Sequence, residues 1–219
     1  MDAAAEIARE IAALPVRDTP SVRAVRKRWS QSLKGSSAED VLAIAKVVEA
    51  HAAQTGKWVA YELIRFHPAA FAAIRERDIA DYAGRLASWY AVDAFGTILA
   101  GPLWAKGGLS DGFVEAWTRS DDRWLRRSAL VATVGLNARK AGGAGDAART
   151  LAICRRLAAD RDDMVEKAMS WALRFLSQRD RPSVEGFMVE MDGKLAPRVV
   201  REVRNKLRTG LKTPRASPR

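Results

Sequence analysis

Apolar side chains recur in this chain at the three- and four-residue spacing of amphipathic helices, and not at the two-residue alternation of strands. A clear example is Val41, Ile44, Ala45 and Val48, which follow Ser37-Ala-Glu-Asp40, a sequence typical of a helix start. Alanine, the strongest helix former, supplies forty of the 219 residues. The sequence therefore predicts an all-helical protein and strongly disfavours an all-β sandwich.

Many segments of this kind follow one another, separated by turns rich in Gly and Pro. The predicted helices cover residues 3–14, 20–33, 38–53, 57–66, 69–75, 78–90, 93–100, 111–118, 121–138, 146–158, 162–178, 183–191 and 195–208. Breaks are predicted at Leu14-Pro15, Gly35-Ser36, His67-Pro68, Gly101-Pro102, Gly107-Gly108 and residues 141–145. Helices of this length with short connections are typical of stacked helical hairpins.

A weak internal repeat points the same way. Residues 122–129 can be laid over residues 162–169, with Arg127 on Lys167 at an offset of forty residues, the period of HEAT-type helix pairs. A compact helical bundle is the alternative. We expect one helical domain over residues 1–208, and a flexible basic tail over 209–219, where Gly210, Pro214 and Pro218 discourage regular structure.

The chain carries a formal charge of +11, and the excess is concentrated in two segments. Residues 194–219 hold nine Lys and Arg against the single Glu202, and residues 17–34 hold six against Asp18. A solvated helix face is the ordinary explanation for one such segment. Two in one small chain favour a polyanionic partner, and nucleic acid is the first candidate.

Most of the common catalytic motifs are missing. His51 and His67 have no Cys or Glu at ligand spacing, so we expect structural roles and no metal. Cys154 falls among helical apolar residues and is predicted to be a buried, inert thiol. Residues 143–148 match a dinucleotide fingerprint, but no strand precedes them, so an interhelical loop is predicted. With one cysteine, no secretion signal and no membrane-length apolar run, we expect a cytoplasmic protein.

Tryptophan is used seven times, and two of these residues lie beside charged residues in an informative way. Trp89 and Asp93 are four residues apart and share one face if their segment is helical, and Trp171 lies between Lys167 and Arg174. Packing in a helical core is the commoner role of any single tryptophan. Together, a carboxylate, large aromatic rings and cations, with Arg126 and Arg127 in between, suit a nucleic-acid backbone.

These motifs resemble the AlkD-like DNA alkylation repair family of alkylpurine DNA glycosylases. The resemblance lies in Ser88-Trp-Tyr-Ala-Val-Asp93, Trp124-Leu-Arg-Arg127 and Lys167-Ala-Met-Ser-Trp-Ala-Leu-Arg174, in the family's order, and it spans about residues 5–208. It implies an all-α fold, a right-handed superhelical solenoid of HEAT-like helical hairpins. It also implies a monomer that acts on alkylated duplex DNA in the nucleoid, with no cofactor and no metal.

The resemblance assigns roles to individual residues. Asp93 is implied as the catalytic carboxylate, with Trp89 and Trp171 as aromatic walls against the sugar of the damaged nucleotide. The implied DNA contacts are Tyr90, Arg126, Arg127, Lys167 and Arg174.

Two departures from the family pattern affect the expected activity. Tyr90 stands where family members often carry a second tryptophan, which keeps an aromatic ring and adds a hydroxyl. Family members can also use an aromatic side chain from an early helix, but no Tyr or Phe precedes Tyr61, and Trp29 does not align. A more open cleft and weaker activity are expected. A non-catalytic HEAT-type DNA-binding or scaffold protein, or a helical protein-interaction module, remain alternatives.

Overall fold

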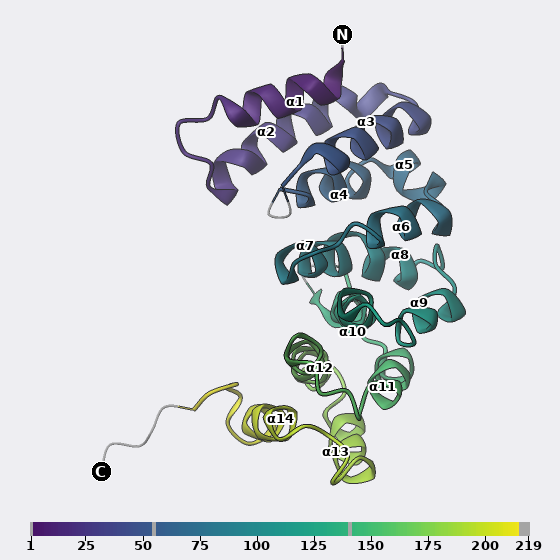
Figure 1. Cartoon of the computed structure of the whole chain (residues 1–219), viewed down its shortest axis with the longest axis vertical. Coiled ribbons are helices and arrows are strands. Elements are labelled where there is room, and N and C mark those ends of the chain that lie inside the picture. Colours follow the sequence, from purple (N-terminus) through teal and green to yellow (C-terminus); the bar gives the residue numbers. More distant parts are fainter. Residues whose placement is uncertain (1, 54–55, 140–141, 215–219) are drawn as a thin grey trace. The chain divides into compact units, whose positions relative to one another are not determined.

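The structure is a computed structural model that describes residues 2–53, 56–139 and 142–214 (Figure 1). Every regular element in these ranges is a helix, and no strand occurs in them, as the apolar spacing predicts. The chain divides into two compact units, Met1–Leu109 and Ser110–Arg219. No helix in the described part is long and apolar enough to cross a membrane.

Unit 1 is built from short helices joined by tight turns. They are α1 (Ala3–Ala12), α2 (Thr19–Ser32), the 3₁₀ turn η1 (Leu33–Gly35), α3 (Ala38–His51), α4 (Trp58–Arg65), α5 (Pro68–Ala73), α6 (Glu76–Ala83), α7 (Trp89–Ala94), the π-helix η2 (Phe95–Ala100) and α8 (Gly101–Ala105). Helix α4 is the centre of the unit: α2, α3, α5 and η2 all pack on it. Its residues from Val59 to Ile64 are buried accordingly.

Unit 2 continues with longer helices. They are α9 (Asp111–Trp117), α10 (Arg123–Asn137), α11 (Ala147–Arg156), α12 (Asp163–Leu176), α13 (Arg181–Glu190) and α14 (Pro197–Thr209). Helix α10 packs on α12 and α12 on α14, while α9, α11 and α13 contact the members of this series. Such packing of alternate helices is consistent with the predicted succession of helical hairpins.

Local sequence signals decide most helix starts. Ser37, Ser110, Asp122, Asp162 and Asp180 each accept a hydrogen bond from a backbone N–H in the first turn of the helix that follows. These contacts satisfy donors that have no partner inside the helix. The observed helices therefore begin within a few residues of the predicted positions.

The predicted helix over residues 78–90 is wrong in its extent. Helix α6 ends at Ala83, and the next helix, α7, begins at Trp89, four residues earlier than the predicted start at 93. The reason is local: the N–H of Gly84 closes the last turn of α6, and the Ser88 hydroxyl caps the first turn of α7. Trp89 and Asp93 consequently belong to one helix.

The predicted break at Gly101-Pro102 is also wrong, because the chain stays helical from Trp89 to Ala105. The wider π-helical turns of η2 come directly before Pro102. Proline has no N–H, and its ring clashes with the preceding turn of a regular α-helix. Widening of that turn lets the helix pass through the proline.

The predicted basic tail starts at the end of α14, whose last residue is Thr209. Gly210 adopts a left-handed backbone conformation with φ 74° and ends the helix. Leu211, an apolar side chain of the tail, is 54% exposed. The part of the predicted tail beyond Pro214 lies outside the described residues.

Candidate functional site

Helix α7 presents a pair of exposed aromatic rings. The Ser88 hydroxyl accepts a hydrogen bond from the Ala91 N–H at 3.3 Å, and the buried side chains of Ala91 and Val92 fix the other face of the helix. Trp89 is 49% exposed and Tyr90 is 47% exposed, with ring centroids 4.5 Å apart. Aromatic rings this exposed contribute little to a core and are suited to binding.

Asp93 lies one turn after Trp89 on the same helix and is half-buried. The hydroxyl of Thr97 donates a hydrogen bond to the Asp93 backbone carbonyl at 2.6 Å, at the point where α7 passes into the π-helix. Such π-helical segments occur frequently at functional sites. The structure thus brings together the carboxylate and the first tryptophan that the sequence pairs, with Tyr90 beside them.

A buried charge cluster holds the segment that leads into α7. The Glu49 carboxylate is fully buried and pairs with the Lys57 ammonium group and the Arg85 guanidinium group, each at 2.7 Å. Lys57 also donates to the Glu49 backbone carbonyl at 2.9 Å. Because Arg85 is three residues before Ser88, this cluster ties the start of α7 to α3 and α4.

Aromatic packing supports the other end of the same helix. The buried Tyr61 ring of α4 lies edge-on to Phe95, the first residue of η2, at 5.7 Å, and to Tyr82 at 5.9 Å. Burial and the nearby Glu49 charge raise the pKa of the Tyr61 hydroxyl. Sequence reasoning missed this support, because the residues involved are far apart in the chain.

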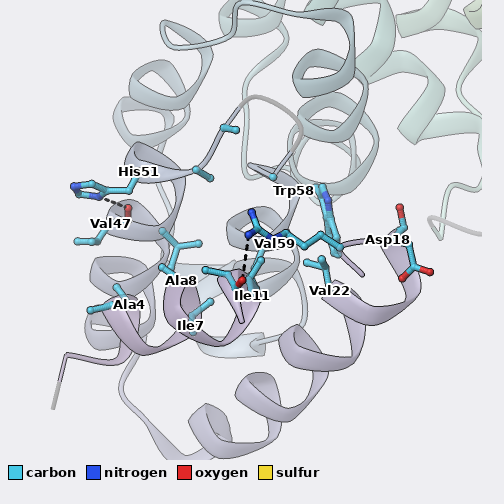
Figure 2. Close-up of a pocket in the computed structure, with 18 of the residues that line it drawn as sticks. Ala4, Ile7, Ala8, Ile11, Asp18, Val22, Val47, His51, Trp58 and Val59 are labelled. Carbon is cyan, nitrogen blue, oxygen red and sulfur yellow. Dashed lines mark hydrogen bonds between the residues drawn. The ribbon is translucent and has the colours of Figure 1, made fainter. Parts of the chain in front are cut away.

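A pocket of about 810 Å³ also lies in unit 1, and helix α1 forms one of its walls (Figure 2). Its walls are mainly apolar and come from α1, α2, α3 and α4, with Tyr90 from α7. Figure 2 shows His51 and Asp18 on opposite sides of the view, with Ile7 and Val59 between them. Short alanine side chains such as Ala4 and Ala8 in α1 leave this space open, and no motif predicted it.

Helix α12 of unit 2 carries three of the predicted site residues. Trp171 is half-buried, with its ring edge-on to Phe175 at 5.9 Å. Lys167 pairs with Asp163 one turn earlier at 2.6 Å and keeps 42% of its side chain exposed. Arg174 donates to the Ser170 hydroxyl at 3.1 Å, and burial lowers the pKa of its guanidinium group.

Helix α10 carries the two remaining arginines, and both make contacts within the protein. Arg126 pairs with Asp160 at 2.7 Å and donates to the carbonyls of Ser120 and Asp121. Arg127 is 5% exposed and donates to the Met164 carbonyl in α12. Within unit 2, these bonds fix the neighbouring helices α10 and α12, and the predicted contacts of both arginines with DNA stay predictions.

Two of the residues expected to be structural, His67 and Cys154, are buried, whereas His51 is exposed. His67 is buried and its Nδ1 accepts a hydrogen bond from the Ala70 N–H at 3.1 Å, which caps α5. Cys154 is fully buried, and burial raises the pKa of its thiol to about 12. No group of three or more His, Cys, Asp or Glu that could hold a metal ion occurs in the described ranges.

The described residues of the glycine-rich stretch before α11 form a loop, as predicted. Steric constraints explain why two of these residues are glycine. A side chain at Gly143 would place its Cβ 2.5 Å from the Leu136 carbonyl oxygen, and Gly145 has a φ of +101°. Both positions therefore require glycine for backbone geometry. Backbone geometry therefore accounts for these glycines without a bound nucleotide.

Comparisons with known proteins agree with the motif resemblance. A family model described as DNA alkylation repair enzyme matches residues 13–207. A solved structure, described as a predicted DNA alkylation repair enzyme from Enterococcus faecalis, superposes with a TM-score of 0.70. It has 19% sequence identity to this chain, and 95% of each chain is covered. No curated protein gives a significant match.

Proposed function

The chain belongs to the DNA alkylation repair enzyme family, and on that basis we propose that it is a DNA glycosylase acting as a monomer. Its substrates are purines alkylated at N3 or N7 in duplex DNA, and its product is an abasic site. The observation that carries this proposal is helix α7, which presents the exposed Trp89 ring one turn before the Asp93 carboxylate. The proposed scaffold is a right-handed solenoid of helical hairpins.

The chemistry needs one carboxylate. A purine alkylated at N3 or N7 is already cationic, so it leaves as a neutral base with the electron pair of the broken C1′–N9 bond (C1′ of the sugar to N9 of the base), and no acid must protonate it. Positive charge builds up on the deoxyribose as an oxocarbenium ion, as in glycoside hydrolysis. Asp93 stabilises this charge and orients the water that adds to C1′, and its carboxylate accepts the proton that the water loses.

The exposed aromatic rings suit a cationic nucleotide. The face of Trp89 can contribute cation–π attraction of about 0.5–2 kcal/mol to a positively charged lesion and exclude water from its sugar. Tyr90 extends the same aromatic surface. Trp171 is proposed as an aromatic DNA contact of unit 2, since part of its ring is exposed.

Cations of unit 2 are proposed to supply the affinity for the DNA backbone. Lys167 is the most accessible of the proposed contacts on α12, and Arg174 lies one turn beyond Trp171. Arg126 and Arg127 are proposed to reach phosphates from α10. Such contacts are independent of sequence and weaken steeply as salt increases.

A non-catalytic DNA-binding protein is the second candidate, and one observation favours it. Trp29, the single aromatic residue before Trp58, donates its indole N–H to Glu10 at 3.1 Å, and Tyr61 is fully buried. Because Trp29 is held by this hydrogen bond and Tyr61 lies in the core, we expect neither ring to serve as an additional aromatic wall. Base excision by this chain is therefore expected to be slower than in a site that has an additional aromatic side chain from an early helix.

Asp93→Asn tests the proposal. The substitution keeps the size of the side chain and removes its charge, so single-turnover release of methylated purine from duplex DNA should fall by about 100-fold or more. Affinity for DNA should stay equal or rise, because repulsion of phosphates is relieved. Asp81→Asn, at an exposed position of α6, is the matched control and should excise at the parent rate.

Two outcomes would contradict the proposal. An Asp93→Asn variant that excises at the parent rate would remove this carboxylate from the mechanism. A parent protein that binds duplex DNA but releases neither 3-methyladenine nor 7-methylguanine would establish the non-catalytic alternative.

A further inference from the structure

A groove on the last helical hairpin is lined mainly by cations. It has a volume of about 570 Å³ and lies between the start of α13 and the second half of α14. Its lining residues are Arg181, Arg201, Arg204, Asn205, Leu207 and Arg208. The sequence analysis noted the charge of this region, but not that four arginines gather around one hollow.

Helical geometry explains the gathering. Arg201, Arg204 and Arg208 have the spacing i, i+3 and i+7, so they lie along one face of α14. At 1.5 Å per residue, this row is about 10 Å long. Arg181, the first residue of α13, adds a fourth guanidinium group to the groove.

Only two of these four charges are compensated within the part of the chain that the structure describes. Arg181 pairs with Glu185 at 2.8 Å, and Arg204 makes a long contact with Asp192 at 3.6 Å. Arg201 and Arg208 are exposed and form no ion pair with any residue that the structure describes. The nearby Glu202 is 7% exposed, and its carboxylate accepts a hydrogen bond from the Ser170 hydroxyl at 2.6 Å.

We propose that this groove binds the phosphodiester backbone of duplex DNA. The inference rests on the DNA-binding part of the proposed function and not on the catalytic role of Asp93. Guanidinium groups present planar pairs of donors that fit phosphate oxygens. With phosphates of one strand about 3.4 Å apart along the duplex axis, the row on α14 spans about three nucleotides.

Solubility alone does not account for the groove. The outer face of a terminal hairpin needs polar residues, but side chains of either sign satisfy that need. Here all four charged side chains in the lining are arginines. A surface of one sign with incomplete internal pairing is the pattern expected where a polyanion is bound.

The test uses the double variant Arg201→Glu/Arg208→Glu and an undamaged duplex of 24 base pairs with a fluorescent label. Anisotropy titrations over a range of salt give the affinity and its salt dependence. For the 24-base-pair duplex we expect about a tenfold or larger loss of affinity, and a log K against log salt slope that is shallower by about two.

Lys46→Glu/Arg77→Glu is the matched control, since it makes the same change in net charge at exposed positions of unit 1. An equal effect of both double variants would overturn the proposal, and so would an unchanged affinity and salt dependence of Arg201→Glu/Arg208→Glu. If circular dichroism shows that the Glu variant is misfolded, Arg201→Gln/Arg208→Gln replaces it, because this variant removes both charges without adding negative ones. It must still lower DNA affinity more than the control variant does. Failure of the catalytic proposal is a separate outcome: the parent protein would bind the duplex DNA but would not excise alkylated bases.

Discussion

Replacement of Lys57 by Met is a stringent test of how the candidate site is built. The Lys57 ammonium group is buried, with 4% of its side chain exposed, and it pairs with the fully buried Glu49 carboxylate at 2.7 Å. The variant keeps the length and most of the packing of the side chain. It leaves Glu49 with one charged partner, Arg85, whose side chain is 36% exposed.

The expected loss follows from the burial of the carboxylate. Removal of one partner of a buried ion pair costs about 3–5 kcal/mol, because the remaining charge stays out of water without compensation. For a chain of this size, about 2–4 °C of melting temperature per kcal/mol corresponds to a fall on the order of 6–20 °C. Since Arg85 leads into α7, hydrogen exchange at Trp89–Asp93 should also become faster.

A second variant separates charge from packing. Glu49→Leu/Lys57→Met removes both buried charges and should recover most of the lost stability, as buried pairs replaced by apolar residues often do. Urea denaturation followed by circular dichroism gives the free energies for the double-mutant cycle. A Lys57→Met loss below about 1 kcal/mol, or a double variant that loses the sum of both single changes, would refute the reasoning.

Three further predictions concern unit 2 and the tail. Arg127→Ala removes a buried donor to the Met164 carbonyl, so it should cost about 1–3 kcal/mol in urea unfolding. If Arg127 also contacts phosphate, duplex affinity should fall even well below the melting range, and unchanged affinity would limit it to a structural role. Trp171→Ala should lower the free energy of unfolding by less than the roughly 3–5 kcal/mol typical of a buried tryptophan, because Trp171 is half-buried. The variant should nevertheless show lower DNA affinity and slower base release, whereas severe unfolding would place the ring in the core. Truncation after residue 208 should leave the melting temperature nearly unchanged, since the removed segment reaches back to the helix mainly through Lys212, which is 49% exposed and only 3.5 Å from Glu202. A large loss of helical signal would show that the tail docks.

The family and the helical fold could be inferred from the sequence because both depend on short-range patterns. Apolar spacing and Ser or Asp caps act within one or two turns, so the starts at Ser37, Asp122 and Asp162 are visible without a structure. The same holds for Trp89 and Asp93, whose separation by one turn needs only helical geometry. Helix extents were less certain where two local signals competed, as at Gly101-Pro102, which a π-helix absorbs.

Tertiary structure decided which charges are available. In sequence, Arg127 and Arg201 are both arginines on amphipathic helices, but the first is buried against α12 and the second lines an exposed groove. Glu49 and Arg85 are 36 residues apart, and no periodic pattern in the sequence predicts their contact. Helical spacing determines which side chains share one face of a helix. Which helix packs against that face is decided by contacts between segments that are distant in the chain. This packing determines whether a charged side chain is buried, forms an ion pair or is accessible to DNA.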